Sequence, residues 1–197
     1  MATKPANKPT TQTVHLITYR YVDAKSGVTK TSKLSMDIGL YELLKANEHV
    51  LFDGFTSDVN VRGKNATITD KWLYVTAGEL RAKNPDTPFA SYWREYLYSL
   101  LIDQDFLDGY KIDTNYVKIM CSKGEKSNTT IRLPSSLYYA LTKMFGDSAD
   151  SIIKQSYATL RSQIEDEDTN FSYLLRHKLL EQVIDPDLKR IDAEATV

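Results

Sequence analysis

The chain has 197 residues, of which 42% are hydrophobic and 26% charged, a composition typical of one or two folded domains and not of a disordered chain. No apolar run approaches the roughly 18 to 20 residues of a membrane helix, and residues 1–13 lack the apolar core of a signal peptide. We therefore expect a cytoplasmic protein with a flexible leader at 1–13 and no membrane partner. The single cysteine, Cys121, excludes an internal disulfide and a multi-cysteine zinc site.

The net charge of −1 conceals a segmental pattern. Residues 1–46 and 111–162 each carry a net charge of +4, whereas residues 47–110 carry −4 and residues 163–197 carry −5. Because the basic blocks are separated by acidic ones, the near-zero total does not exclude an anionic partner such as DNA. A solvated surface of mixed charge is the alternative explanation.

A β-hairpin is predicted at the start of the folded region. Residues 14–23 are aromatic and β-branched, the next residues contain a glycine turn, and residues 30–36 alternate between polar and apolar positions. A helix is expected to follow directly, because Asp37 is a favourable N-cap and an apolar face continues to about Asn47.

Residues 48–86 are predicted to form a β-rich insertion, because short β-branched and aromatic runs alternate there with turn residues. A helix then begins with Thr87 as N-cap and Pro88 at its first position. Its core-facing stripe repeats at helical spacing and consists of Trp93, Tyr96, Leu97, Leu100 and Leu101.

The second half of the chain predicts the same order of elements. Residues 116–121 and 128–133 read as a hairpin, a helix starts at residues 134–136, and a second helix starts after the Gly146 turn with Ser148 as its cap. A further amphipathic helix is expected from about Phe171 until the proline at position 186.

An ungapped shift of 97 residues aligns the two hairpin-helix segments, with Leu34 on Ile131 and Tyr41 on Tyr138, and in the first strands Tyr19 on Tyr116. A second match at an offset of 60 aligns the helix around Trp93 with the one around residue 153. We therefore predict a first unit at 14–110 containing the insertion 48–86, a second unit at 111–163, and a C-terminal helix and tail at 164–197. Chance similarity is the alternative, because few aligned residues are identical.

The segment 129–137, TTIRLPSSL, followed by a helix, a short turn and a second helix, resembles the ribbon-helix-helix family of DNA-binding proteins over residues 128–162. The resemblance implies an α+β fold in which the strands of two units pair into an antiparallel ribbon that enters the major groove. Two units in one chain resemble the tandem ribbon-helix-helix proteins of conjugative plasmids, where a monomer forms a pseudo-dimer, whereas a lone unit requires a homodimer. The chain departs from the family in having a hairpin where the family has one strand.

Strand alternation identifies the side chains that the resemblance assigns to DNA. In the second unit Ile131 and Leu133 face the helices, so the opposite face is expected to point outward. Arg and Lys donate to guanine, and Asn, Thr and Ser reach other base edges or phosphate. An ordinary solvent-facing strand carries the same residue types. The predicted DNA-binding strand residues of the two units are Thr31, Lys33, Ser35, Asn128, Thr130 and Arg132.

The start of the second helix in the second unit is a further candidate, because free backbone N–H groups at a helix N-terminus attract phosphate. Ser148 and Ala149 occupy that position, although the carboxylate of Asp147 beside them opposes an anion.

The sequence contains no Gly-rich phosphate loop, nucleophile elbow or metal-ligand spacing, so we expect no enzyme, cofactor or metal site. His15, His49 and His177 are isolated in the sequence, and structural roles are expected for them.

The leading hypothesis is a non-catalytic protein that binds double-stranded DNA, either as a plasmid or mobile-element accessory factor working with other plasmid-processing proteins or as a transcriptional repressor. The rival is a protein-interaction or assembly module with a duplicated α+β fold and no role in nucleic-acid binding.

Overall fold

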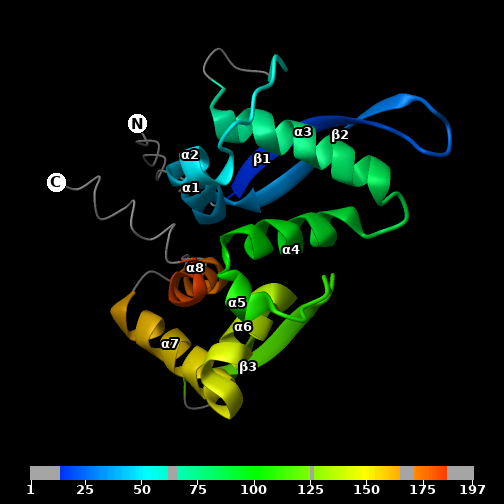
Figure 1. Ribbon diagram of the computed structural model, residues 1–197. Coiled ribbons are helices and arrows are strands. Elements are labelled where there is room, and N and C mark those ends of the chain that lie inside the picture. Colours follow the sequence, from blue (N-terminus) through cyan, green and yellow to red (C-terminus); the bar gives the residue numbers. More distant parts are fainter. Residues whose placement is uncertain (1–13, 62–65, 125–126, 165–170, 186–197) are drawn as a thin grey trace, which may run out of the picture.

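The computed structural model describes residues 14–61, 66–124, 127–164 and 171–185, and it shows an α+β arrangement of two separate antiparallel hairpins with helices packed against them (Figure 1). The first half contains β1 (Val14–Val22), β2 (Thr29–Asp37), α1 (Ile38–Ala46), α2 (Glu48–Leu51), α3 (Ile68–Lys83) and α4 (Phe89–Leu101). After α5 (Gln104–Leu107), the second half contains β3 (Tyr116–Gly124), β4 (Ser127–Pro134), α6 (Ser135–Phe145), the 3-10 turn η1 (Gly146–Ser148), α7 (Ala149–Gln163) and α8 (Phe171–Val183). The leader 1–13 and the tail after residue 185 lie outside the described residues.

Both predicted hairpins are present, and their faces alternate as expected. In β2, Leu34 and Met36 are buried, and in β4, Ile131 and Leu133 are buried. Gly27 closes the first turn with a φ of 66°, a left-handed conformation that favours glycine. The helices predicted after each hairpin are also present, although α4 begins at Phe89 with Pro88 as its N-cap, one residue later than expected.

The β-rich insertion predicted at 48–86 is wrong. In the described part of this segment there is no strand, and α3 takes up residues 68–83. A capping box starts α3: Thr67 Oγ1 accepts a hydrogen bond from Asp70 N at 3.1 Å, and Asp70 Oδ2 accepts one from Thr67 N at 3.0 Å. Leu73 and Ala77 are then fully buried at helical spacing, and packing of this face overrides the strand preference of the β-branched and aromatic residues around it.

The single ribbon implied by the family resemblance is not formed. β2 pairs with β1 and β4 pairs with β3, and in the described residues the strands form two sheets of two strands each. The predicted pairing is replaced because each hairpin already supplies an antiparallel partner within its own half, and local pairing closes a much shorter loop.

The helices α4 and α8 lie next to each other between the two halves (Figure 1). Their ends meet in an antiparallel bridge between Ile102 and Ile184, in which Asp103 N donates to Val183 O at 3.0 Å and Asp185 N donates to Leu101 O at 2.9 Å. The core-facing residues of both helices are at most 1% exposed, so the central core joins both halves of the chain. They are Trp93, Leu97, Leu101, Leu175, Leu179, Leu180 and Val183.

The order of elements repeats as a hairpin followed by three longer helices. The strands β2 and β4 and the helices α1 and α6 correspond at the predicted offset of 97 residues, but α3 corresponds to α7 and α4 to α8. Two equivalent hydrogen bonds support this correspondence: Tyr41 Oη donates to Asp70 Oδ1 at 3.0 Å, and Tyr138 Oη donates to Asp150 Oδ1 at 3.0 Å. The expected match of the Trp93 helix with α7 at an offset of 60 does not follow this order of elements, because it skips α3.

Candidate nucleic-acid interface

All six predicted strand residues lie on the hairpin faces opposite the buried strand residues. Each of them is exposed in the structure. The structure does not bring the two sets together on one ribbon, however, because β2 and β4 belong to different sheets. Each set instead faces solvent beside the outward residues of its own hairpin partner.

The partners of the β4 residues were not predicted. In the register of the second hairpin Lys118 lies opposite Arg132, Met120 opposite Thr130, and Ser122 opposite Asn128. These three side chains of β3 are exposed as well. They were identifiable from the sequence, because alternation along a predicted hairpin applies to both strands, but the family resemblance directs attention to one strand per unit.

The cross-strand pair Lys118 and Arg132 places two positive charges directly opposite each other. Like charges at opposite positions destabilise a sheet. Neither side chain belongs to an ion pair in the described residues, and the described outward positions of β3 and β4 carry no carboxylate. An anion placed over this face relieves that repulsion.

The first hairpin carries Leu16, Thr18 and Arg20 opposite Ser35, Lys33 and Thr31. Its outward positions include the carboxylate of Asp37 at the end of β2, and the face is bordered by a cavity of about 390 Å³. This cavity is lined by both basic side chains together with residues of α3 and of the loop before it, including Asn60 and Asp70. The first hairpin is therefore the less open of the two ribbons.

The helix-start candidates Ser148 and Ala149 differ from each other. Ser148 is exposed and its side chain makes no capping hydrogen bond, whereas Ala149 is only 3% exposed, so its side chain packs inside. Asp150, in the first turn of α7, already places a carboxylate at this helix end and accepts the hydrogen bond of Tyr138. Ala149 has only its backbone to offer a phosphate.

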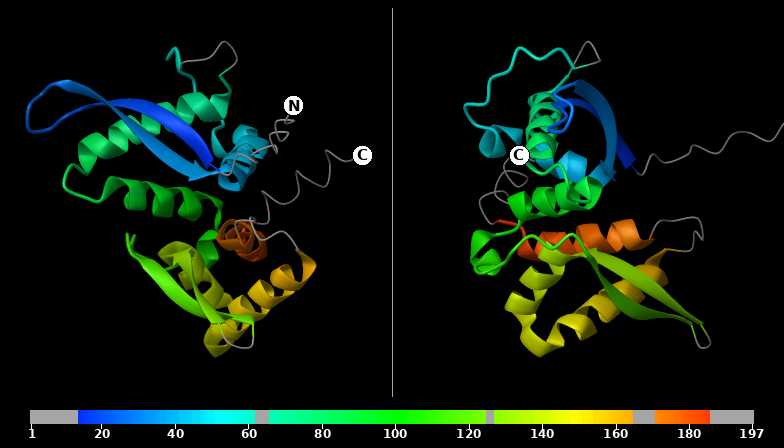
Figure 2. Two further views of the ribbon diagram at one scale, coloured as in Figure 1. Left: turned by 180° about the vertical axis from the view of Figure 1, so that it is seen from behind. Right: turned by 90° about the vertical axis from the view of Figure 1, so that its right-hand side faces the viewer.

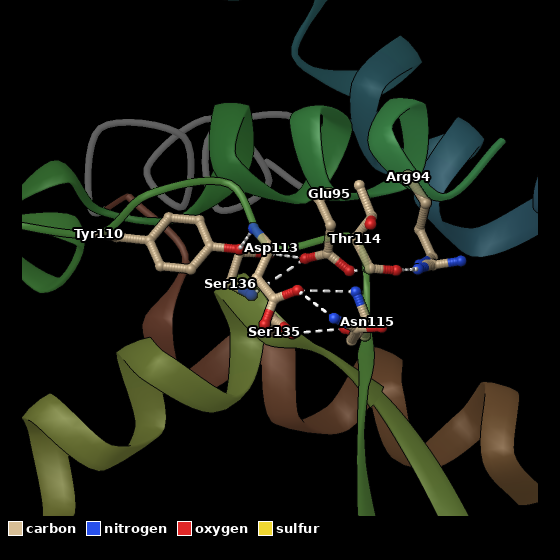
Figure 3. A network of polar contacts seen from close by, with 8 residues as sticks. All are labelled: Arg94, Glu95, Tyr110, Asp113, Thr114, Asn115, Ser135 and Ser136. Carbon is tan, nitrogen blue, oxygen red and sulfur yellow. Dashed lines mark hydrogen bonds and ion pairs between the residues drawn. The ribbon is translucent and has the colours of Figure 1, made fainter. Parts of the chain in front are cut away.

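A buried polar network fixes the base of the second hairpin to α4 (Figure 3). The carboxylate of Glu95, whose residue is 0% exposed, accepts hydrogen bonds from Ser136 N at 3.0 Å and Ser136 Oγ at 2.9 Å. It thus caps the N-terminus of α6 from another helix, and it also pairs with Arg94 at 3.3 Å. Burial, the largest cause, raises the pKa of Glu95 despite these partners.

The same network holds the strand that enters the hairpin. The guanidinium of Arg94 lies 3.6 Å from the centre of the Tyr116 ring and donates to Thr114 O at 3.5 Å. Ser135 Oγ donates to Asn115 O, which joins the end of β4 to the start of β3 (Figure 3). These contacts orient the exposed ribbon relative to the helical core.

His15 and His177, for which structural roles were expected, each lie beside other side chains in the structure. The imidazole of His15 stacks on Tyr41 at 3.7 Å between ring centres and lies 3.6 Å from Asp70, and burial lowers its pKa. His177 lies 3.3 Å from Glu181 in the next turn of α8. Within the described ranges no group of three or more His, Cys, Asp or Glu side chains has the spacing of a metal site.

Comparison with known proteins finds no matching family model, no similar curated protein and no similar solved structure. None of the helices in the described part of the chain has the length and apolar character needed to cross a bilayer. Any functional assignment must therefore come from the geometry of the hairpins and their helices.

Proposed function

We propose that the chain binds double-stranded DNA by placing the outer faces of its hairpins in the major groove, with β3–β4 as the principal ribbon. The observation that carries this proposal is the like-charge pair Lys118 and Arg132, neither in an ion pair among the described residues, on an exposed ribbon whose described outward positions carry no carboxylate. A two-stranded ribbon fits the major groove, where arginine and lysine donate to guanine and Asn128 offers an amide to adenine.

The proposal keeps the two units of a tandem ribbon-helix-helix protein but not the ribbon that the two units would share. The order β4, α6, α7 follows the family pattern, and the first half repeats it with α3 in place of the predicted insertion. We therefore infer two related units in one chain, in which each hairpin forms a complete ribbon by itself. A repressor or an accessory factor of a mobile element fits such a protein.

The test is binding of labelled duplex DNA across a salt series from about 50 to 300 mM. Replacing phosphate counterions makes the logarithm of affinity fall linearly with the logarithm of salt, with a slope of about 0.9 per phosphate contact. Arg132→Ala and Lys118→Ala should each lower affinity for a preferred site by about 1 to 3 kcal/mol. Lys45→Ala, which removes an exposed positive charge from the end of α1, is the matched control and should leave affinity nearly unchanged.

Protein binding is the second candidate, and a specific observation favours it. Leu16 and Met120, which are 62% and 63% exposed, lie within the same outer faces. Exposed apolar residues are common at protein interfaces, although apolar side chains also contact the thymine methyl group in DNA. Absence of duplex binding even at 50 mM salt would leave the protein-interaction module as the better assignment.

A further inference from the structure

The bridge between the ends of α4 and α8 has a local two-fold axis. In the bridge between Ile102 and Ile184 the two hydrogen bonds are reciprocal, since each helix end donates to and accepts from the equivalent atoms of the other. Such an exchange of bonds defines a local two-fold in an antiparallel pair. The similar hydrogen bonds of Tyr41 and Tyr138 support an extension of this correspondence to the helices behind each hairpin.

The two hairpins are arranged in a related way. Both lie on one side of the molecule, the side that faces the viewer in the left panel of Figure 2, and the strands β2 and β4 run in roughly opposite directions. Two ribbons on a common side in opposite orientations match DNA, whose own local two-fold relates half-sites in inverted orientation. One chain thus presents the arrangement that other DNA-binding proteins assemble from two subunits.

The outer faces of the two hairpins nevertheless differ in chemistry at every basic position. Taking β1 with β3 and β2 with β4 in their observed registers, Leu16 corresponds to Lys118 and Ser35 to Arg132. The basic outward residues are Arg20 and Lys33 in the first hairpin and Lys118 and Arg132 in the second. None of them has a basic counterpart, because the two charges of the second hairpin lie near its open end, whereas those of the first lie nearer its turn. The remaining correspondences are Arg20 with Ser122, Lys33 with Thr130, Thr18 with Met120, and Thr31 with Asn128.

We propose that the DNA target of this chain consists of two unlike half-sites in inverted orientation, each read by one hairpin of a single chain. The inference rests on the proposed function and specifies its substrate. A true palindrome is disfavoured, because identical half-sites would require equivalent donors on the two ribbons. Since the shared core joins the two halves, the spacing between half-sites is fixed as well.

The experiment selects duplexes from a random library with the full chain and then repeats the selection with two double variants. Arg20→Ala with Lys33→Ala removes the charges of the first hairpin, Lys118→Ala with Arg132→Ala removes those of the second, and Lys45→Ala serves as control. We expect two different short motifs at constant spacing, with each double variant losing base preference in one motif only. A duplex with a single motif should bind at least tenfold more weakly, and inserting five base pairs between the motifs should have a similar effect.

Several outcomes overturn the inference. One contiguous motif that both double variants alter would show that the hairpins do not read separate half-sites. Two identical half-sites bound by two chains, measured by the mass of the complex, would assign the symmetry to a dimer. Failure to enrich any duplex at 50 mM salt would instead refute the proposed function itself, so the two failures are distinguishable.

Discussion

Glu95 provides the sharpest test of how the halves are held together. Its carboxylate has no exposed surface, and it is the acceptor for both polar hydrogens of Ser136 at the start of α6. Glu95→Ala leaves the backbone N–H and the hydroxyl of Ser136 buried without an acceptor and removes the partner of Arg94. Glu95→Gln keeps a carbonyl oxygen of similar shape and removes the negative charge.

The expected loss in the free energy of unfolding follows from these contacts. Each buried donor left without a partner costs about 1 to 3 kcal/mol, and breaking a buried ion pair from one side costs about 3 to 5 kcal/mol. We expect Glu95→Ala to lower the free energy of unfolding by about 3 to 5 kcal/mol, since the two effects overlap. With a urea dependence of about 2 kcal/mol per molar, the unfolding midpoint should fall by about 2 M. Glu95→Gln should lose less, about 1 to 2 kcal/mol.

The pH dependence separates the charge from the hydrogen bonds. The pKa of Glu95 in the folded protein is raised above its ordinary value of 4.5. The folded state therefore binds the proton more tightly than the unfolded state, so ionisation costs stability progressively from about pH 4.5 up to the folded pKa. The wild type should thus lose stability relative to Glu95→Gln as the pH rises through this window, and the difference should be constant above it.

Urea unfolding of the wild type and both variants, followed by circular dichroism and tryptophan fluorescence at pH 4, 5, 6 and 7, measures these values. A folded Glu95→Ala variant that loses less than 1 kcal/mol would refute the capping role. A stability difference between the wild type and Glu95→Gln that is independent of pH would refute the raised pKa, while leaving the hydrogen bonds intact.

Four further substitutions test the packing of the helices by thermal and urea unfolding. Gly78→Ala places a methyl group 2.3 Å from the backbone oxygen of Arg20, so α3 must move away from β1, and we expect a loss of about 3 kcal/mol; wild-type stability would show that α3 is not held so closely. Gly39→Ala brings the new methyl group within 2.8 Å of the Tyr173 and His177 side chains of α8. We expect the clash to outweigh the gain in helix propensity and to lower the free energy of unfolding by about 1 to 3 kcal/mol. A stabilised variant would contradict this contact. Tyr41→Phe and Tyr138→Phe remove equivalent hydrogen bonds, and losses of about 1 kcal/mol each are expected; no loss in either variant would mean that the bonds are not formed.

The parts of the fold that the sequence predicted depend on local periodicity. The alternation of Leu34 and Met36 in β2, and the stripe of Trp93, Leu97 and Leu101 in α4, each appear within a window of about ten residues and agree with the observed burial. The outward positions on β2 and β4 follow from the same alternation, which is why every predicted strand residue is exposed.

The parts that were missed have two different causes. The start of α3 carries a local signal, the capping box of Thr67 and Asp70, which the prediction of a β-rich insertion overlooked, whereas the close approach of Gly78 to β1 is a contact between distant segments. Glu95 and Ser136 are 41 residues apart, and no pattern in either segment indicates that one caps the other. The parallel order of elements in the two halves was missed in part, because it includes α3 and α7 only when residues 68–83 are recognised as a helix.

Each half of the chain contacts the first helix of the other half at its N-terminus. These contacts affect how the two hairpins would be presented to DNA in the proposed function. Glu95 of α4 caps the N-terminus of α6. At the N-terminus of α1, the Nη2 and Nε atoms of Arg176 in α8 lie 2.8 and 2.9 Å from Asp37 Oδ2. The Tyr173 hydroxyl of α8 also hydrogen-bonds with the backbone of Gly39. Each first helix follows directly from a hairpin, so these contacts set the direction of both ribbons. A ligand that needs both hairpins at once then meets them already oriented, and the entropy of aligning two independent modules is not lost on binding. Weakening one of these contacts, as in Glu95→Gln, should therefore reduce discrimination against altered half-site spacing more than affinity for a single half-site.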